Sequence, residues 1–386
     1  MAKIDDSVKK KVPELRFKGF TDEWEERKFA DFIDVKSGKD YKHLNSGSIP
    51  VYGTGGYMLS VDRALSDTDA IGIGRKGTID KPYLLKAPFW TVDTLFYAVP
   101  KQNIDLQFSL SIFKKINWKK FDESTGVPSL SKTVINSVSV SVPNFEEQQK
   151  IGSFFKQLDD TIALHQHKLD LLKEQKKGFL QKMFPKNGEK VPELRFEGFT
   201  DDWEERKLSE IGKIVTGNTP NTSNKDYYNG DFLFVSPADI QENRYVNKTT
   251  TTLTELGFKT GRLVPKGATL FVSIGSTIGK TGQSICDVIT NQQINSVISF
   301  SDYDDDFIYT SILNSSTKIK QLAATQAVPI INKNEFGKSI IKIPSLEEQQ
   351  KIGAFFKQLD DIIALHQRKL DLLKEQKKGF LQKMFV

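Results

Sequence analysis

The sequence predicts an α+β protein in which two globular, mixed α/β domains are separated by two long antiparallel helices that form an intramolecular coiled coil. Three observations lead to this prediction. Segments at both ends of each half of the chain are repeated almost unchanged, one repeated segment carries a heptad pattern, and the regions between them contain short β-rich runs. Together they indicate a pseudo-twofold internal repeat within 386 residues.

The composition indicates a folded protein that dissolves in water. Hydrophobic residues make up 38% of the chain and charged residues 27%, and no apolar run approaches the length of a membrane helix. The N-terminal segment lacks the apolar stretch of a signal peptide, and Cys286 is the single cysteine. We therefore expect a reducing, cytoplasmic location. The net charge of +6 agrees with a nucleic-acid partner but does not require one.

The internal repeat consists of two conserved segments, here called frames, around interiors that differ. The segment VPELRFKGFTDEWEERKF at 12–29 returns at 191–208, and the longer segment at 146–184 returns at 347–385, each with three differences. The second interior is 22 residues longer than the first. Two matched surfaces suit two copies of one partner, and two unlike interiors suit two ligands. The alternative is a recent duplication in which the two copies have since diverged without selection for binding a partner or a ligand.

The longer frames are predicted to be helices of roughly 55 Å. Their apolar residues recur in alternating steps of four and three, which is the seam of a coiled coil. His165 and His366 fall within this seam, where a polar residue that sets the register is favoured over a metal site or pH switch. The seam residues are Ile151, Phe155, Leu158, Ile162, Leu169 and Leu172 in the first copy, and Ile352, Phe356, Leu359, Ile363, Leu370 and Leu373 in the second.

Each interior contains β-rich runs between turn signals, such as AIGIG and LFYAV in the first and FLFVS and ATLFVSI in the second. We expect five segments in order. They are an N-terminal arm (1–17), a first variable domain (18–143), a central helix (144–186), a second variable domain (187–343) and a C-terminal helix (344–386).

The stretch VSIGSTIGKT at 272–281 resembles a phosphate-binding loop, but its glycines are separated by three residues instead of four. The matching stretch of the first half, IGRKGTIDK, has Lys76 in place of Gly275 and Asp80 in place of Gly279. We therefore interpret both stretches as one β-turn with different side chains, and not as an ATP site.

Motifs for catalysis or metal binding are missing from the sequence. The pairs Asp159-Asp160 and Asp360-Asp361 lie in the middle of the predicted helices, with lysines one turn away, and are interpreted as part of a solvated charged face. We expect that the chain alone catalyses no reaction and binds neither metal nor cofactor.

The repeated VPELRF-GFTD segments, the EEQQKI-FF helices and the two unlike interiors together resemble the specificity (S) subunit of a type I restriction–modification enzyme. The resemblance covers essentially the whole chain. It implies two target recognition domains, each reading one half of an asymmetric, bipartite site in double-stranded DNA, and helices that set the spacer. It also implies that the frames bind two adenine methyltransferase (M) subunits, which two restriction (R) subunits join. S-adenosylmethionine, ATP and Mg²⁺ would then belong to these partners.

Side chains that could read DNA lie in both variable domains. Arg suits guanine, Asn and Gln suit adenine, and Lys suits phosphates. Arg75 and Lys76 are favoured because they lie at the turn that the two halves share. The candidates are Lys39, Tyr41, Lys42, Tyr57, Arg75, Lys76 and Lys81 in the first domain, and Asn218, Asn221, Asn224, Lys225, Ser273, Ser276, Thr277, Lys280, Asn291, Gln292 and Gln293 in the second.

Three other functions compete with this interpretation. One is a coiled-coil scaffold or adaptor without DNA specificity. Another is an ATP-dependent enzyme built on Lys280 and Thr281. The third, a repressor-like dimer acting alone, fits poorly with two different variable domains in one chain.

Overall fold

The computed structural model describes residues 12–323 and 329–386. Residues 1–11 of the expected N-terminal arm lie outside this range. The chain divides into two compact units, one reaching to Gln166 and including Lys369–Val386, the other covering His167–Arg368. Each unit therefore holds one variable domain together with part of both long helices, and the helices do not form a unit of their own. Among the described residues, no helix combines the length and apolar content that crossing a membrane requires.

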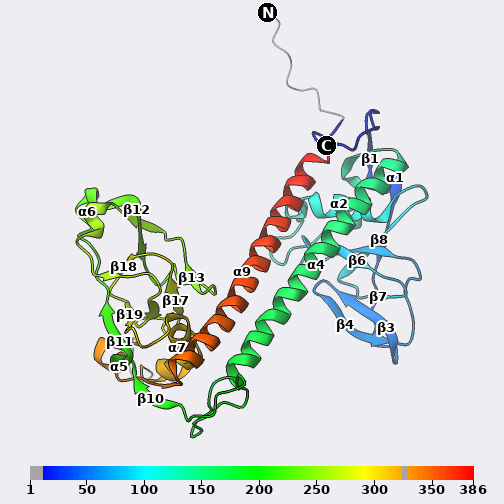
Figure 1. Ribbon diagram of the computed structural model, residues 1–386. Coiled ribbons are helices and arrows are strands. Elements are labelled where there is room, and N and C mark those ends of the chain that lie inside the picture. The colour runs from blue at the N-terminus through cyan, green and yellow to red at the C-terminus, as the bar shows by residue number, and fades with distance from the viewer. Residues whose placement is uncertain (1–11, 324–328) are drawn as a thin grey trace, which may run out of the picture. The chain divides into compact units, whose positions relative to one another are not determined.

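The first domain is built from three small sheets and three short helices (Figure 1). A four-stranded sheet has the order β2-β8-β5-β6, a three-stranded sheet the order β4-β3-β7, and β1 pairs with β9. The strands are β1 (Glu25–Lys28), β2 (Ile33–Ser37), β3 (Ser46–Gly53), β4 (Gly56–Val61), β5 (Ala70–Gly74), β6 (Tyr83–Leu85), β7 (Trp90–Thr91), β8 (Leu95–Pro100) and β9 (Ser139–Val142). The α-helices are α1 (Phe29–Phe32), α2 (Leu106–Lys115) and α3 (Lys132–Ser137), and η1 (Trp118–Phe121) is a 3₁₀-helix.

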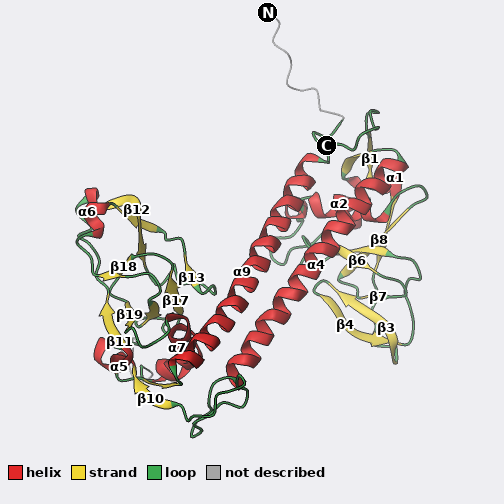
Figure 2. Cartoon of the chain, viewed as in Figure 1, coloured by secondary structure: helices red, strands yellow, loops and turns green. Residues whose placement is uncertain are grey.

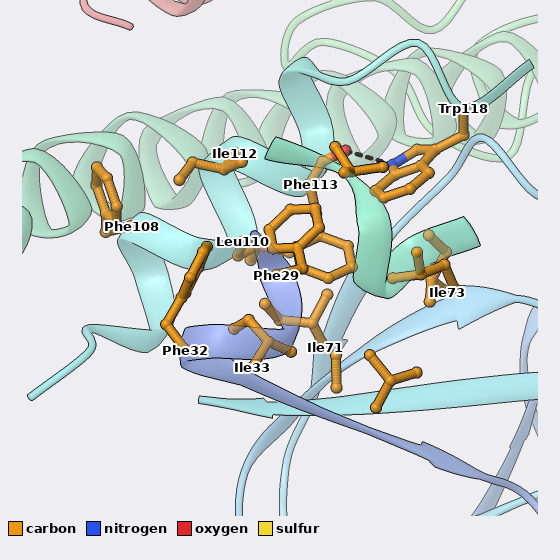
Figure 3. Close-up of a cluster of buried hydrophobic side chains, with 14 of the residues drawn as sticks. Phe29, Phe32, Ile33, Ile71, Ile73, Phe108, Leu110, Ile112, Phe113 and Trp118 are labelled. Carbon is orange, nitrogen blue, oxygen red and sulfur yellow. Dashed lines mark hydrogen bonds between the residues drawn. The ribbon is translucent and has the colours of Figure 1, made fainter. Parts of the chain in front are cut away.

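Aromatic residues of α1, α2 and η1 form the core of this domain beside the buried strand β5 (Figure 3). The ring of Phe29 lies 4.8 Å from that of Phe113, and Trp118 packs against both. The buried indole Nε1 of Trp118 donates to the carbonyl oxygen of Phe113 at 2.8 Å, so its polar group is satisfied inside the core. The α2 helix starts at Asp105, whose carboxylate accepts from the amide of Phe108.

The second domain repeats this plan with larger sheets, ordered β11-β19-β16-β17-β13 and β14-β12-β18-β15, and β10 pairs with β20. The elements β13, β14, α6 and β15 lie between Leu208 and Ser276, where the sequence has its extra length. The strands are β10 (Glu204–Lys207), β11 (Gly212–Thr216), β12 (Tyr228–Val235), β13 (Tyr245–Val246), β14 (Thr251–Leu253), β15 (Leu263–Val264), β16 (Thr269–Val272), β17 (Thr281–Ser284), β18 (Val288–Thr290), β19 (Ile294–Ser299) and β20 (Ile340–Ile343). The helices are α5 (Leu208–Ile211), η2 (Lys225–Tyr227), α6 (Glu255–Phe258), α7 (Asp305–Gln321) and α8 (Lys333–Gly337).

The two long helices are α4 (Phe145–Lys182) and α9 (Leu346–Lys383), each of 38 residues (Figure 2). In the first unit Phe154 of α4 contacts Phe380 of α9, with ring centroids 5.1 Å apart. In the second unit Phe179 of α4 contacts Phe355 of α9 at 5.0 Å. An early residue of one helix therefore meets a late residue of the other in both units. The predicted antiparallel pairing of two long helices is confirmed, and so is the α+β fold class.

The residues of the predicted seam have a different role at the start of each helix. All twelve of its side chains are buried or half-buried. However, Ile151, Phe155, Ile352 and Phe356 pack into the cores of the globular domains. Their neighbours Phe154 and Phe355 supply the contacts between the helices instead. The apolar pattern continues into the domains because the first turns of each helix have to bury two faces.

The end of each long helix completes the core of a domain. In the first unit, Phe385 contacts the rings of Trp24, Phe108 and Phe155 at 6.1, 5.6 and 5.7 Å. In the second unit, Phe184 contacts Trp203, Phe307 and Phe356 at 5.7, 5.8 and 6.0 Å. The frames supply three of the four rings in each cluster, and both interiors supply a phenylalanine at the fourth position.

A buried ion pair joins the two frames of each unit. Two nitrogens of the Arg16 guanidinium donate to the Glu147 carboxylate, at 2.7 and 2.8 Å, and Arg195 makes the same pair with Glu348 at 2.8 Å. Residues 12–17 of the expected arm are therefore packed against the helices, as the bond from the Leu15 amide to the Lys383 carbonyl also shows. The frames of each unit contact one another, so a change in one has to fit the other. The interiors also contact the frames, through the β1–β9 and β10–β20 ladders and the aromatic cores.

We predict that Phe385→Ala and Phe184→Ala each destabilise one unit by about 3–5 kcal/mol, since each removes a large buried ring from a packed core. Hydrogen exchange measured peptide by peptide would show faster exchange in the first unit for the former substitution and in the second for the latter. Leu372→Ala, an exposed position on α9, is the control and is expected to change stability by less than about 0.5 kcal/mol. Equal exchange in all three variants and the parent chain would contradict this role.

Candidate nucleic-acid interface

The turn shared by the two domains is held by the same backbone bonds in each. After β5, the amide of Gly77 donates to Pro128 O at 2.8 Å and the amide of Leu130 donates to Arg75 O at 2.9 Å. After β16, Gly275 donates to Pro329 O at 3.0 Å and Ile331 donates to Ser273 O at 2.9 Å.

These bonds correct the alignment of the two turns by one residue. Gly77 has φ +92° and Gly275 has φ +95°, a backbone region that favours glycine, so Gly275 corresponds to Gly77 and not to Lys76 as the sequence comparison proposes. It follows that Ser273 occupies the place of Arg75, and Ile274 that of Lys76. The same scaffold therefore carries two exposed cations in the first domain, and the buried Ser273 and half-buried Ile274 in the second.

The stretch at 272–281 does not have the geometry of a phosphate-binding loop. Such a loop leads into a helix and points free amides at the phosphates. Here Lys280 is followed by strand β17. The amides of Gly275, Ile278, Gly279 and Lys280 all donate to backbone carbonyls within the domain. The interpretation of this stretch as a β-turn is confirmed.

A cleft of about 1100 Å³ opens beside the shared turn of the first domain. One wall carries Arg75 and Lys76 after β5, with Asp93, Thr94 and Phe96 before and within β8. The other wall is the segment Glu123–Lys132, which sequence reasoning missed. Its Ser-Thr-Gly composition, together with the turn that it contacts, is the signal that could have identified it.

The remaining candidates of the first domain lie outside this cleft. Lys39, Lys42 and Lys81 are exposed, and Tyr57 is largely exposed near the turn between β3 and β4. Tyr41 instead packs against a hydrophobic cluster, so its ring has a structural role. Of the seven candidates, the structure brings Arg75 and Lys76 together in one cleft.

Most amide candidates of the second domain are occupied within their own loops. The side-chain oxygen of Asn218 accepts from the Arg262 amide at 2.8 Å, and those of Asn221 and Asn224 accept from amides two residues further on. Asn291 bonds to Gln293 twice, and Gln292 accepts from the hydroxyl of Thr219 at 2.7 Å. These side chains stabilise the loops. Their role in the loops is sufficient to explain why the sequence is rich in asparagine, and contacts with DNA bases are not needed for that explanation.

The prediction that Ser273 contacts DNA is wrong. Its side chain is 2% exposed, and its hydroxyl accepts a hydrogen bond from the side-chain amide of Asn295 at 2.8 Å. It directly follows β16, all four residues of which are buried. Ser276, Lys280 and Lys225 are exposed, and Thr277 is half-buried.

Comparison with known proteins identifies the family. A family model described as the type I restriction modification DNA specificity domain matches residues 21–174 and 200–375, which together are most of the chain. The chain belongs to this family. The two matches coincide with the two halves of the internal repeat, so the protein contains two specificity domains.

Similar proteins carry the same description. The HindI specificity subunit of Haemophilus influenzae is 32% identical over 40% of this chain and 35% of its own length, and the MjaIX specificity subunit of Methanocaldococcus jannaschii is 27% identical over 45% and 41%. The matched regions thus span less than half of these relatives. A putative type I specificity subunit of Mycoplasma pneumoniae is 24% identical over 93% of the chain and 96% of its own length. The crystal structure of an S subunit from M. genitalium has the same fold, with a TM-score of 0.78, 15% identity and coverage of 97% and 99%.

The second specificity domain is fastened to the long helices by a buried charged network. Arg244 donates to Gln283 at 2.8 Å and to Asp306 at 2.5 Å, and it lies 3.5 Å from Asp360 of α9. Lys176 of α4 donates to the other oxygen of Asp360 at 2.5 Å. Asp360 is 7% exposed, so its assignment to a solvated face is wrong.

The equivalent position in the first specificity domain has a simpler arrangement. Asp159 accepts from Lys114 of the domain at 2.8 Å and from Lys377 of α9. Burial alone would raise the pKa of the Asp159 carboxyl, but the bonds from the two lysines outweigh it and lower the pKa. Asp160 is exposed and pairs with Lys156, as the solvated-face interpretation expects. Within residues 12–323 and 329–386, no three His, Cys, Asp or Glu side chains are grouped to hold a metal ion.

We predict that Asp360→Ala destabilises the second unit by about 3 kcal/mol, because it leaves the buried Arg244 with one carboxylate instead of two. Denaturant titration followed by hydrogen exchange in each unit measures this effect. Asp160→Ala, which breaks only an exposed pair, is expected to cost less than about 0.5 kcal/mol. A similar small effect from both substitutions would show that the network contributes nothing to stability.

Proposed function

We propose that this chain is the DNA sequence-recognition subunit of a type I restriction–modification enzyme and catalyses no reaction itself. Each specificity domain reads one half of an asymmetric, bipartite site in double-stranded DNA. The observation that carries the proposal is that the family model matches twice, on domains that present different side chains from one shared turn. Two scaffolds with unlike chemistry suit two different half-sites.

The helices α4 and α9 set the spacer between the half-sites. Two residues separate the last strand of the first domain from the start of α4, and Phe184, just beyond the end of α4, lies in the core of the second domain. The segment from Phe145 to Lys182 between these two points is a single helix. Because DNA rises about 3.4 Å per base pair, a fixed helix length favours one spacing of half-sites over others.

The repeated frames bind two methyltransferase subunits through exposed leucines of the long helices. Leu164 and Leu171 of α4 and Leu365 and Leu372 of α9 are between 51% and 66% exposed. The leucines of each helix are seven residues apart, which places them on one face away from the seam. Large exposed apolar side chains in a row are typical of a surface that a partner covers.

Partners therefore supply the chemistry. The two leucine pairs are equivalent in the repeat, which suits two copies of one partner. S-adenosylmethionine belongs to the methyltransferase subunits, and ATP and Mg²⁺ belong to the restriction subunits when these are present. Adenine methylation by the partner requires the base to leave the duplex, so the recognition subunit has to hold the surrounding DNA in place.

A methylation reaction on a random DNA library tests this function. The chain is combined with the methyltransferase subunits, and methyladenine is mapped on the products. We expect one split motif, with two short half-sites at a constant separation. If the complex forms but neither methylates nor binds any sequence preferentially, the chain is a scaffold without DNA specificity.

A second test concerns the surface that the partner covers. We predict that Leu171→Glu combined with Leu365→Glu weakens association with the methyltransferase subunit at least about tenfold, since each change places a charge in an apolar contact. Association is measured by titration with the purified subunit. Leu256→Glu, at an exposed leucine of the second domain, is the matched control and should bind as the parent chain does. Unchanged binding of the double variant would place the docking surface elsewhere.

A further inference from the structure

The cleft of the first specificity domain has features that point to one base. We propose that Arg75 reads a guanine in the half-site of the first domain, with the segment Glu123–Lys132 as the opposite wall of the reading cleft. This inference rests on the proposed function and adds to it the identity of a base and of the residue that selects it.

The guanidinium of Arg75 makes one hydrogen bond to the backbone and leaves its other donors available. Its Nη1 donates to the carbonyl of Asp93 at 3.3 Å, and its central carbon lies 5.9 Å from the ring of Phe96. The Arg75 amide is fixed by Thr94 O at 2.8 Å. Among the residues that the structure describes, none forms an ion pair with this arginine. One donor of this exposed guanidinium thus contacts the backbone, and the other donors remain available to a planar acceptor.

The charges around Arg75 favour a base over a phosphate. The cleft is lined by the cations Arg75, Lys76 and Lys132, but also by the acids Asp93 and Glu123. A phosphate within the cleft would face both carboxylates, whereas the edge of a base is neutral. Guanine presents O6 and N7 as two adjacent acceptors in the major groove, and a guanidinium fork binds both at once. An adenine at the same position would turn an amino group toward the arginine.

The opposite wall is rigid at its base and exposed at its tip. The carboxylate of Asp122 accepts from the amides of Ser124 and Ser129 at 3.0 and 2.9 Å, which closes the segment on itself. The backbone bonds between this segment and residues 75–77 fasten it to the turn that carries Arg75. At the tip, Val127 is 56% exposed, and a side chain added at Gly126 would meet no atom within 4 Å. The two segments are thus bonded to each other beside the cleft, and the exposed residues Gly126 and Val127 are among those that line it.

The second specificity domain has no equivalent of this arginine. The corresponding Ser273 lies in the core, and Ile274 stands in place of Lys76. Removing Arg75 is therefore expected to change one position in one half-site, while the other half-site and the spacing stay as they are. The unaffected half-site is an internal control in every measurement.

The test is methyladenine mapping on a DNA library with the complete complex of this chain and its methyltransferase subunits. In Arg75→Ala, we expect the motif to lose its preference for guanine at one position of one half-site, with discrimination there falling about 10- to 100-fold. Arg75→Lys keeps the charge without the fork, so it should also lose the preference. Arg63→Ala, which removes an exposed arginine of the same domain outside the cleft, should leave the motif unchanged.

The outcomes separate this inference from the proposed function. If the parent complex methylates a split motif, and Arg75→Ala lowers methylation uniformly while Arg75→Lys restores it, then Arg75 contacts a phosphate and the inference is overturned. An unchanged motif in both Arg75 variants overturns it as well. If the parent complex methylates no split motif, the proposed function fails, and the inference fails with it. Assembly of each variant with the methyltransferase, measured by size-exclusion chromatography, shows that the variant is folded.

Discussion

The structure depends on the closure of each domain core by an aromatic side chain at the end of a long helix. Phe385 and Phe184 contact a tryptophan and two phenylalanines in their respective units. Because these rings come from both frames and from one position of the interior, neither frame can change alone without opening a cavity. The near-identity of the two copies is the consequence. The interiors share this constraint where they meet the frames, at the phenylalanine of each cluster and along the β1–β9 and β10–β20 ladders.

The same division explains how one chain can carry two recognition surfaces. The turn after β5 and the turn after β16 have the same backbone bonds, so their conformation does not depend on the side chains that they present. Arg75 and Lys76 can then stand where Ser273 and Ile274 stand in the other domain. The fold keeps the backbone of this turn constant while its side chains differ. Specificity in such a protein resides in a few side chains on a shared scaffold.

The periodic features of the chain could be predicted from its sequence. The heptads of 146–184 and 347–385 predict two long helices, because a seam that recurs every 3.5 residues has few other solutions. The β-rich runs predict strands, and the repeated frames predict a pseudo-twofold plan. Features that depend on three-dimensional neighbours were missed. The exchange of roles between Phe154 and Phe155 depends on where the domain core lies, and the burial of Asp360 depends on Arg244, which is 116 residues away.

The candidate site was predicted less well than the fold. The sequence comparison aligned Gly275 with Lys76, one residue away from its true counterpart. The backbone bonds of the two turns and the positive φ of Gly77 and Gly275 reveal the correct match. The sequence shows that the second domain is rich in asparagines that could contact bases. It does not show that Asn218 and Asn291 already form hydrogen bonds within the domain, because these bonds depend on the folded loops. The wall at Glu123–Lys132 has no periodic pattern, and it becomes a candidate only because its backbone is bonded to the Arg75 turn.

The central claim is that the interiors determine the half-sites and the frames determine their separation. It is tested most directly by replacing residues 209–346 with a second copy of 30–145, which keeps every frame residue. Methyladenine mapping with this chain should give two inverted copies of the first half-site at the separation found for the parent chain. Retention of the parent's second half-site, or a changed separation with two copies of the first, would contradict the account.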